Sequence, residues 1–402
     1  MLEVPARCLD LTRLISRSGR GAHTGVDRVE HAYLRALVSD PIPLFLLVRT
    51  WLGYLLLDQT GATAVLDRIE GRVPWGATDM LGHLQRKAHP MKRRAEADLR
   101  RLAIGRSPKT GLSRLVQHAL PAGTAYINVG HSNLSEQTLG AMAKVGSVNV
   151  MVHDTIPLDF PNFQRDGTVE RFEEKMRVVA AHADLVICNS AVTAEDVNRW
   201  FGAWGHTPKR TVARLGIDLH PRGAEISRNK AFFTVGTIEP RKNHAFLLDL
   251  WDDLRRDVPE DEMPELKIVG ARGWKNEDVF RRLDAKPPHV QEIGDMSDET
   301  LVRHLSGARG LLFPSHAEGF GLPAVEALSL GVPVICNDLP VFREILGNSP
   351  IYAKAGDMYL WKQLILQLAG QNGAEQTDIT GDRGTFHAPT WADHFNHVLK
   401  LV

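Results

Sequence analysis

Residues 315–336 read SHAEGFGLPAVEALSLGVPVIC, and this stretch decides the fold of the chain. One apolar run precedes it at 311–313 and another closes it at 332–336, with a glycine-rich turn and a helical pattern between them. Pro323 suits the first turn of that helix, where its missing N–H costs nothing, and Gly331 suits the helix end. The order strand, turn, helix, strand predicts half of a parallel α/β layer.

Two glutamates, Glu318 and Glu326, lie eight residues apart on either side of this turn. The turn itself comprises Gly319, Phe320, Gly321 and Leu322. Unpaired backbone N–H groups at a helix start favour an anion. We expect Glu318 to hold the hydroxyls of a sugar and Glu326 those of a ribose, with a diphosphate at the helix start between them. The stretch therefore predicts a nucleotide-sugar site.

The same stretch resembles the signature of the family 4 retaining glycosyltransferases, two glutamates in the form EGFGLPAVEA. The likeness continues in AFFTVGTIEPRKNHAFLLDLW at 231–251 and in GVPVICNDLPVFREILG at 331–347. It covers the C-terminal half strongly and the N-terminal half only in patches. The resemblance implies the GT-B fold, in which two Rossmann-like domains face a cleft.

The length of 402 residues exceeds what a single core usually supports, so two α/β domains are expected. The polar stretch HPRGAEISRNK at 220–230 reads as the linker. We therefore expect an acceptor-binding domain at 1–225 and a nucleotide-sugar-binding domain at 226–388. In the family a terminal helix crosses back to the first domain, which implies the same for 389–402.

Apolar runs predict strands in both halves, with helical patterns between them. The predicted strands are 44–48, 126–129, 148–152 and 185–188 in the first half, and 232–235 and 266–269 in the second. Helices are expected at 26–37 and 170–181, and Asn243 is expected to cap a further helix that carries Phe246 and Trp251 on its apolar face.

The motif VGTIEPRKN at 235–243 places Arg241 and Lys242 just after a strand. Carboxyl ends of strands are where doubly wound sheets bind ligands. Two cations there would neutralise a departing diphosphate, although an exposed basic turn is the alternative. The family has a lysine matching Lys242, but many members carry an arginine where this donor-binding loop has Thr237. Arg241 would then replace that arginine, or the loop is a subfamily variant.

Two further glycines, Gly270 in VGARGWK and Gly294 in EIGDMSDETL, each follow a hydrophobic strand end. The corresponding family loops contact the nucleotide base, largely through backbone groups, so both are candidate base-pocket residues. Ordinary strand-exit turns are the alternative.

The first half of the chain is expected to contribute residues to the nucleotide-sugar site. SRSGRGAHTGVDRVEHAY at 16–33 is a glycine-rich loop that ends at Gly25, just before a helix, and it resembles the family loop that approaches the donor phosphate. His131 in NVGHSNL and His153 in MVHDTIP each follow a strand. The family carries a functional histidine near the donor sugar in this domain. The sequence leaves open which of the two it is, and a structural role is the alternative for each.

Composition excludes several classes. Lys plus Arg and Asp plus Glu number 48 each, so charge gives no argument for nucleic acid. Cys8, Cys188 and Cys336 are odd in number and widely spaced, which favours reduced cysteines in a cytosolic protein. No Cys/His cluster has zinc spacing and no strand ends in Asp-x-Asp, so we expect no metal and no cofactor beyond the nucleotide-sugar co-substrate. No apolar run approaches the ~20 residues of a membrane span.

The segment between Arg86 and Arg114 holds ten Lys/Arg against two acids, Glu96 and Asp98. Such a patch would attract anionic headgroups and bring a lipid-linked acceptor to the cleft, on the inner face of the cytoplasmic membrane. A solvated helical face and a site for a phosphate-bearing acceptor are the alternatives.

Together these features predict a glycosyltransferase that moves a sugar from a nucleotide diphosphate to a hydroxyl of a glycan or lipid-linked acceptor in surface polysaccharide or glycolipid synthesis. Retention of anomeric configuration is implied by the resemblance. The segments GTIEPRKN and TGVDRVE most resemble those of bacterial polysaccharide mannosyl- or rhamnosyltransferases, which makes GDP-mannose the first donor to test. The alternatives are a glycoside hydrolase, which also needs two carboxylates, a two-domain epimerase or phosphorylase, and a degenerate nucleotide-sugar-binding subunit.

Overall fold

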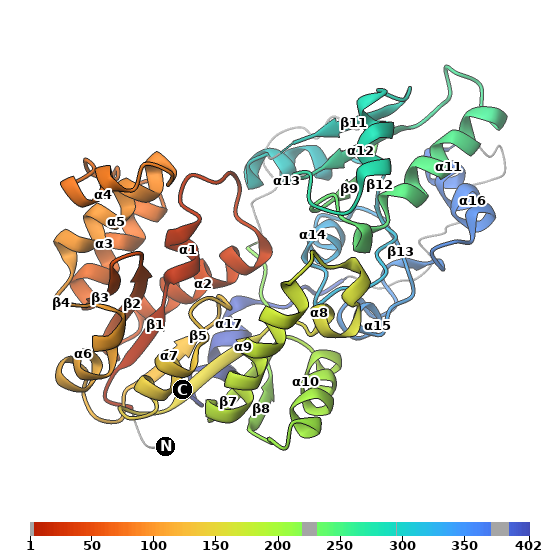
Figure 1. The fold of residues 1–402 in the computed structure, drawn as a ribbon. Coiled ribbons are helices and arrows are strands. Elements are labelled where there is room, and N and C mark those ends of the chain that lie inside the picture. The colour runs from red at the N-terminus through yellow and green to blue at the C-terminus, as the bar shows by residue number, and fades with distance from the viewer. Residues whose placement is uncertain (1–3, 219–230, 295, 371–385) are drawn as a thin grey trace.

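The computed structural model describes residues 4–218, 231–294, 296–370 and 386–402. Its strands form two separate sheets, one of eight strands drawn from residues 7–212 and one of six drawn from residues 231–352 (Figure 1). The predicted linker at 220–230 and the predicted domain boundary at 225/226 lie outside the described residues. We call the first sheet with helices α1–α10 the N-terminal domain, and the second with α11–α16 the C-terminal domain.

The N-terminal sheet runs in the order β4-β3-β2-β1-β5-β6-β7-β8. All neighbours are parallel except β3, which is antiparallel to both β2 and β4. The strands are β1 (Arg7–Asp10), β2 (Leu44–Thr50), β3 (Gly53–Leu57), β4 (Gly105–Ser107), β5 (Ala125–Asn128), β6 (Val148–Val152), β7 (Leu185–Cys188) and β8 (Lys209–Val212).

The C-terminal sheet is wholly parallel in the order β11-β10-β9-β12-β13-β14. Its strands are β9 (Ala231–Val235), β10 (Glu265–Val269), β11 (Val290–Ile293), β12 (Gly310–Phe313), β13 (Val334–Cys336) and β14 (Ile351–Tyr352). Central strands of both sheets, such as β6 and β12, are buried at every position. Helices cover both faces of such sheets, which is why these strands read as continuous apolar runs.

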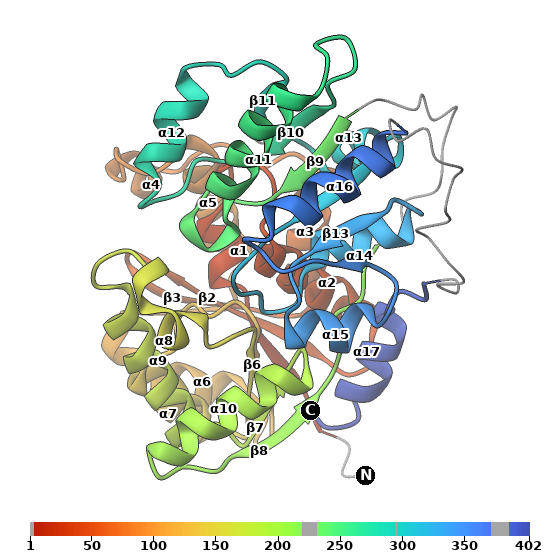
Figure 2. The same cartoon turned by 90° about the vertical axis from the view of Figure 1, so that its right-hand side faces the viewer.

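Helices connect the strands and cover the sheets (Figure 2). Those of the N-terminal domain are α1 (Thr12–Ser16), α2 (Gly25–Ser39), α3 (Gln59–Ile69), α4 (Met80–Leu84), α5 (Pro90–Leu102), α6 (Leu112–Ala119), α7 (Glu136–Met142), α8 (Ile156–Asp159), α9 (Thr168–His182) and α10 (Ala191–Ala203). Those of the C-terminal domain are α11 (His244–Asp257), α12 (Glu277–Asp284), α13 (Asp298–Ser306), α14 (Leu322–Ser329), α15 (Pro340–Leu346) and α16 (Met358–Ala369). In the part of the chain that is described, no helix combines the length and the apolarity that crossing a bilayer requires.

The last helix, α17 (Trp391–Val398), follows the C-terminal domain in sequence but lies against the N-terminal domain (Figure 1). The side chains of Tyr33 and His394 share a hydrogen bond of 2.8 Å, and Thr211 and His397 share one of 2.6 Å. Arg7 donates to the carbonyl of Val402 at 3.1 Å. These contacts connect residues 394–402 to helix α2, to the central strand β1 and to the edge strand β8 of the first sheet.

The fold is therefore the expected GT-B arrangement of two Rossmann-like domains, and every predicted strand and helix is present. One local prediction was wrong in mechanism. Asn243 does precede α11, but it takes a left-handed conformation and its side chain makes no capping bond. Its amide nitrogen instead lies 3.4 Å from the carbonyl of Pro314, so it links the β9 loop to the β12 loop.

Candidate active site

The segment 314–321 joins β12 to α14, which begins at Leu322, and Gly321 precedes the helix with φ +88°. A side chain at Gly321 would strain the backbone and approach the ring of Phe342 to 2.7 Å, so this turn requires glycine. Pro323 lies in the first helical turn and Gly331 follows the helix with φ +74°, as predicted. The start of α14 lies against the N-terminal domain, since Leu322 is within 3.3 Å of a Cβ built on Gly25.

Glu318 is the centre of a buried charge cluster. Its Oε1 lies 2.6 Å from Lys242 Nζ and its Oε2 lies 3.0 Å from an Arg241 nitrogen. Arg241 also binds Glu239 at 2.6 Å and donates to the carbonyl of Ala317 at 2.6 Å. The Glu318 side chain is only 7% exposed, so these pairs are poorly screened by solvent.

The cluster fixes the charge of each member. Burial alone would raise the pKa of Glu318, but Lys242 and Arg241 outweigh it and lower the pKa to about 2. Burial lowers the pKa of Lys242, and the adjacent Glu318 opposes that effect. Burial likewise acts to lower the pKa of Arg241, but Glu318 and Glu239 raise it above its ordinary value. Glu318 is therefore an ionised hydrogen-bond acceptor at neutral pH and a poor base.

The loop after β9, which carries Lys242, is closely packed at Gly236 and Thr237. Gly236 has φ +142°, and a Cβ there would come within 3.1 Å of the Lys242 side chain. Thr237 is predicted to bind the donor. Its methyl group lies against Gly273, since a Cβ built on Gly273 would come within 2.7 Å of that methyl carbon. Thr237 therefore packs between the β9 and β10 loops.

The two base-pocket candidates differ in their surroundings. Gly270 has φ +146°, and a Cβ there would collide with the carbonyl of Gly236, so packing alone demands glycine. Gly294 has no neighbour within 4 Å of a Cβ built on it, so packing places no such demand.

Glu326 lies in α14 and is paired with Arg28 of α2 across the domain interface. Arg28 also lies 3.8 Å from Asp298 of α13. At the start of α2, a Cβ on Gly25 would come within 3.3 Å of Leu322, the first residue of α14. The predicted residues Gly25, Leu322 and Glu326 thus meet where the first turns of α2 and α14 converge. Arg28 was missed, although it stands in the quoted loop motif.

His131 and His153 follow the adjacent strands β5 and β6, with ring centroids 4.9 Å apart. His153 Nε2 donates to the carbonyl of Val129 at 2.7 Å, and His131 Nε2 lies 2.9 Å from the carbonyl of Met151. Burial lowers the pKa of both, that of His153 to about 4, so both rings are neutral at neutral pH. His131 adopts φ +53°, and Lys175 donates to its carbonyl at 3.2 Å.

His153 belongs to the domain interface. A Cβ on Gly319 would come within 2.7 Å of the His153 carbonyl and 3.0 Å of Asp154 Cβ. Gly319 therefore allows the turn of the C-terminal domain to meet the end of β6.

Asp154 is a site residue that our interpretation of the sequence left without a role. Burial raises its pKa, while the nearby Arg241 acts to lower it and Glu318 acts to raise it. Asp154 Oδ1 accepts a hydrogen bond from the backbone of Ile156 at 3.1 Å. The available signal was its position directly after a strand and beside His153.

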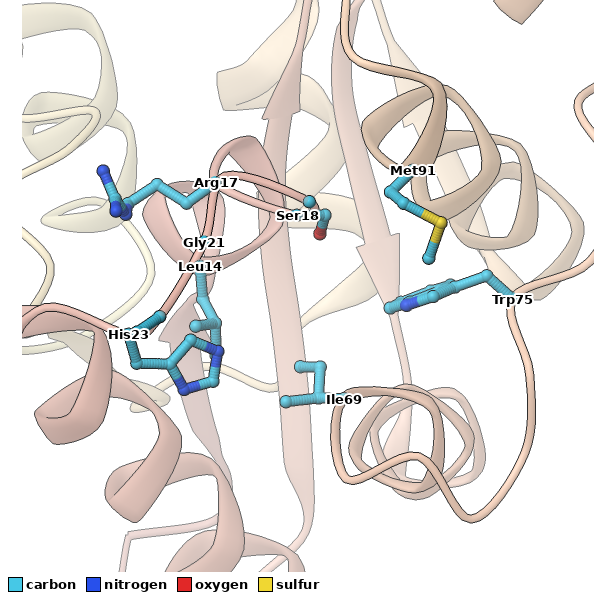
Figure 3. A pocket seen from close by; sticks show the side chains of 10 residues that line it. Leu14, Arg17, Ser18, Gly21, His23, Ile69, Trp75 and Met91 are labelled. Atoms are coloured by element: carbon cyan, nitrogen blue, oxygen red, sulfur yellow. The ribbon is translucent and has the colours of Figure 1, made fainter. Parts of the chain in front are cut away.

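A cavity of about 130 Å³ lies on the N-terminal side, between the glycine-rich loop and the start of α5 (Figure 3). Leu14, Ile69, Trp75 and Met91 line its apolar part, and Arg17, Ser18 and His23 line its polar part. Among the described residues, no group of three or more His, Cys, Asp or Glu side chains is arranged to hold a metal ion.

Residues 218–368 match the family model of glycosyl transferases group 1, which supports the resemblance to glycosyltransferases over that part of the chain. The chain is 36% identical over 217 residues to the serotype-specific mannosyltransferase WbdA of Escherichia coli, an alignment that covers 48% of this chain and 26% of that protein. It is also 26% identical over 227 residues to the O-antigen chain mannosyltransferase B of Escherichia coli, covering 54% and 59%. The alignments thus span 26% and 59% of the length of these relatives, less than two thirds in both cases.

Solved structures share the fold. HepE from Anabaena, in complex with UDP and glucose, superposes with a TM-score of 0.58 over 98% of this chain and 99% of its own, at 16% identity. TarM superposes with a TM-score of 0.54 over 76% of this chain and 60% of its own, at 14% identity. Both are GT-B structures.

Proposed function

We propose that this chain, whose residues 218–368 match the glycosyl transferases group 1, transfers a sugar from a nucleotide diphosphate to an acceptor hydroxyl in bacterial polysaccharide synthesis. The observation that carries the proposal is the buried Glu318–Lys242–Arg241 cluster, which stands beside the start of α14 where the two domains meet.

In this proposal the donor diphosphate lies on the N–H groups at the start of α14, and Lys242 neutralises the charge that develops as it leaves. Arg241 is held by Glu239, Ala317 and Glu318, so its role is to position Glu318. Lys242 has fewer fixed partners, Glu318 and the ring of Phe313, and can turn toward phosphate. No metal ion is required in this arrangement.

Glu318 binds hydroxyls of the donor sugar and Glu326 those of the ribose. Because Glu318 has a pKa of about 2, it is a poor acceptor for the proton of the attacking hydroxyl. The leaving phosphate takes that proton on the face it departs from, which gives retained configuration. His153, neutral and buried beside Gly319, orients the sugar from the opposite domain.

The proposed donor is GDP-mannose and the proposed acceptor a glycan or a lipid-linked glycan. Relatives from Escherichia coli and Salmonella typhimurium that carry the name mannosyltransferase support the choice of sugar. A degenerate, non-catalytic subunit is disfavoured by the intact cluster, in which Lys242 pairs with Glu318 although Thr237 replaces the family arginine.

The test is thermal unfolding of the protein with millimolar GDP, UDP, dTDP, ADP or CMP in parallel. A ligand at ~100 times its dissociation constant that binds only the folded state adds about 2.7 kcal/mol of stability. We expect a raised midpoint with GDP alone and loss of that shift in Glu326→Ala. The exposed Glu299→Ala, on α13, is the matched control and should keep the shift. No shift with any nucleotide would overturn the proposal.

A further inference from the structure

The short helix α4 presents apolar side chains to solvent. Met80 is 87% exposed, Leu84 is 69% exposed and Leu81 is 38% exposed. A Cβ on Gly82 would come within 3.4 Å of the carbonyl of Arg93, so Gly82 is the position that packs on α5. The apolar face formed by Met80, Leu81 and Leu84, which we call the α4 face, therefore points outward.

The α4 face stands out from the rest of the surface. Three of the eleven large apolar side chains that are exposed in the described part of the chain belong to this one helix of five residues. Figure 1 shows α4 at the outer end of the N-terminal domain, above α5. Exposed apolar residues that gather in one region mark an interaction site more often than single ones do.

The α4 face is held in place. Asp79 caps the helix by accepting from Gly82 N at 2.7 Å, and Arg100 of α5 binds both oxygens of Asp79 at 2.6 Å. The Arg100 side chain is 5% exposed. A bidentate pair of this kind fixes geometry. It therefore holds α4 in one position on α5, with the apolar side chains of the α4 face exposed to solvent.

The basic segment between Arg86 and Arg114 divides into inward and outward cations. Arg100 pairs with Asp79, and Arg101 pairs with Asp98 at 2.6 Å. Arg86 and Lys87, directly after α4, are exposed and pair with no carboxylate among the described residues. Further exposed cations follow in this segment at Arg106, Lys109 and Arg114. Arg86 and Lys87 therefore give the segment directly after α4 a positive charge.

We propose that the α4 face and the adjacent cations Arg86 and Lys87 dock on an anionic lipid bilayer. Met80, Leu81 and Leu84 enter the interfacial layer, while the two cations meet the phosphates of the headgroups. Apolar insertion together with a basic patch is the two-signal combination that stable peripheral binding needs.

A protein partner fits these observations less well. Stable protein interfaces bury about 800 Å² on each partner, and the α4 face offers three side chains on a helix of five residues. A bilayer demands no matching shape, and its negative charge complements that of the surface.

Docking on this face would bring the cavity lined by Trp75 and Met91 close to the bilayer, where it could receive the acceptor, and this consequence rests on the proposed function. Met91, in the first turn of α5, lines the cavity together with Trp75 (Figure 3). A side chain on Gly19 of the glycine-rich loop would collide with His89, which shows how closely that loop packs on the segment after α4. A lipid-linked acceptor in the bilayer would meet the cavity a short distance from the α4 face.

The test is sedimentation of the full chain with vesicles of phosphatidylcholine alone and with about one third phosphatidylglycerol. We expect binding to the anionic vesicles, weakened by salt, and little binding to the neutral ones. Met80→Ser with Leu84→Ser should weaken binding at least tenfold. Arg86→Gln and Lys87→Gln should each weaken it about fivefold, since one cation near an anionic surface contributes roughly that factor. Tyr359→Ser, at a 71% exposed side chain of the other domain, is the matched control and should bind like the native chain.

Equal binding by the Met80/Leu84 double variant, or no binding of the native chain to anionic vesicles, would overturn the proposal. Each variant is also heated with GDP. An unchanged unfolding midpoint shows that the variant is folded, whatever its vesicle binding. A retained nucleotide shift shows that failure of docking is separate from failure of the proposed function.

Discussion

The two domains contribute to the candidate site in different ways. The C-terminal domain supplies formal charge, since Glu318, Lys242 and Arg241 form one buried cluster within two loops of a single sheet. The N-terminal domain supplies close backbone contacts and neutral rings, at Gly25, His131 and His153, and one cation, Arg28, that pairs with Glu326. The difference suggests that the C-terminal domain binds the donor by itself, and that the N-terminal domain closes over the reacting sugar.

The largest effect should come from Glu318→Gln. Turnover should fall by about 10²–10³, as when one pre-organised partner of the reacting groups is removed. Stability should also fall by about 3 kcal/mol, because Lys242 loses its buried partner. Steady-state kinetics and urea unfolding measure the two effects. Glu299→Gln, which removes a carboxylate from the exposed ion pair with Arg303, serves as the control. Native-like turnover in Glu318→Gln would refute the role assigned to Glu318.

A second change acts on the interface between the domains. Gly319→Ala places a methyl group within 2.7 Å of the His153 carbonyl, so the domains must separate slightly. We expect turnover to drop by about 10²-fold, the scale of a misplacement of 1 Å, with nucleotide binding little changed. Measuring both the nucleotide dissociation constant and the turnover of the variant distinguishes a defect in binding from a defect in catalysis. Loss of nucleotide binding in this variant would mean that the N-terminal domain is part of the donor site proper.

The pH dependence of stability should separate the contribution of His153 from that of Glu318. His153 has a folded pKa of about 4 against an unfolded value of about 6.5, so the unfolded state binds more protons and stability falls as pH drops between these values. The loss should be about 3 kcal/mol. Glu318, with a folded pKa of about 2, loses its contribution only below its unfolded pKa of about 4.5.

His153→Gln tests this window, because the amide can still donate to the Val129 carbonyl but does not titrate. Urea unfolding at pH 7 and pH 4.5 should show a smaller difference for the variant than for the native chain. An identical difference in both proteins would show that His153 does not titrate in this window.

The smallest effect should come from Gly294→Ala. Nothing lies within 4 Å of a Cβ at this position, so stability should change by less than about 0.5 kcal/mol. Gly270→Ala is the contrasting variant, since its φ of +146° and the Gly236 carbonyl both oppose a side chain. We expect a loss of about 2 kcal/mol or more there. Similar unfolding midpoints for the two variants would contradict this distinction.

Much of the C-terminal domain could be predicted from the sequence because its site follows local rules. The turn before Pro323 and the loop that carries Lys242 each sit between two apolar strands, and a contiguous motif encodes their shape. Parallel pairing of β9 with β12 then brings Lys242 and Glu318 together. Strand β3 was missed because only two residues separate it from β2, so the two strands form one nearly continuous apolar run, and the edge strand β4 was missed because it has only three residues, none of them with an apolar side chain.

The partners across the interface could not be predicted in this way. Arg28 meets Glu326 from 298 residues away, and Asp154 approaches Arg241 only because Gly319 lets the domains touch. The sequence could not decide between His131 and His153 either, because each follows a strand, and only the approach of Gly319 to the His153 carbonyl favours His153. Such contacts depend on domain placement, and no local pattern of residues encodes it.

The most direct test of the account is calorimetric titration of the nucleotide that stabilises the native chain, expected to be GDP, into Lys242→Met and Gly319→Ala. The account predicts that Lys242→Met binds at least tenfold more weakly, while Gly319→Ala binds like the native chain. Native affinity in Lys242→Met, or equal losses in both variants, would contradict a donor site built by the charge cluster of the C-terminal domain.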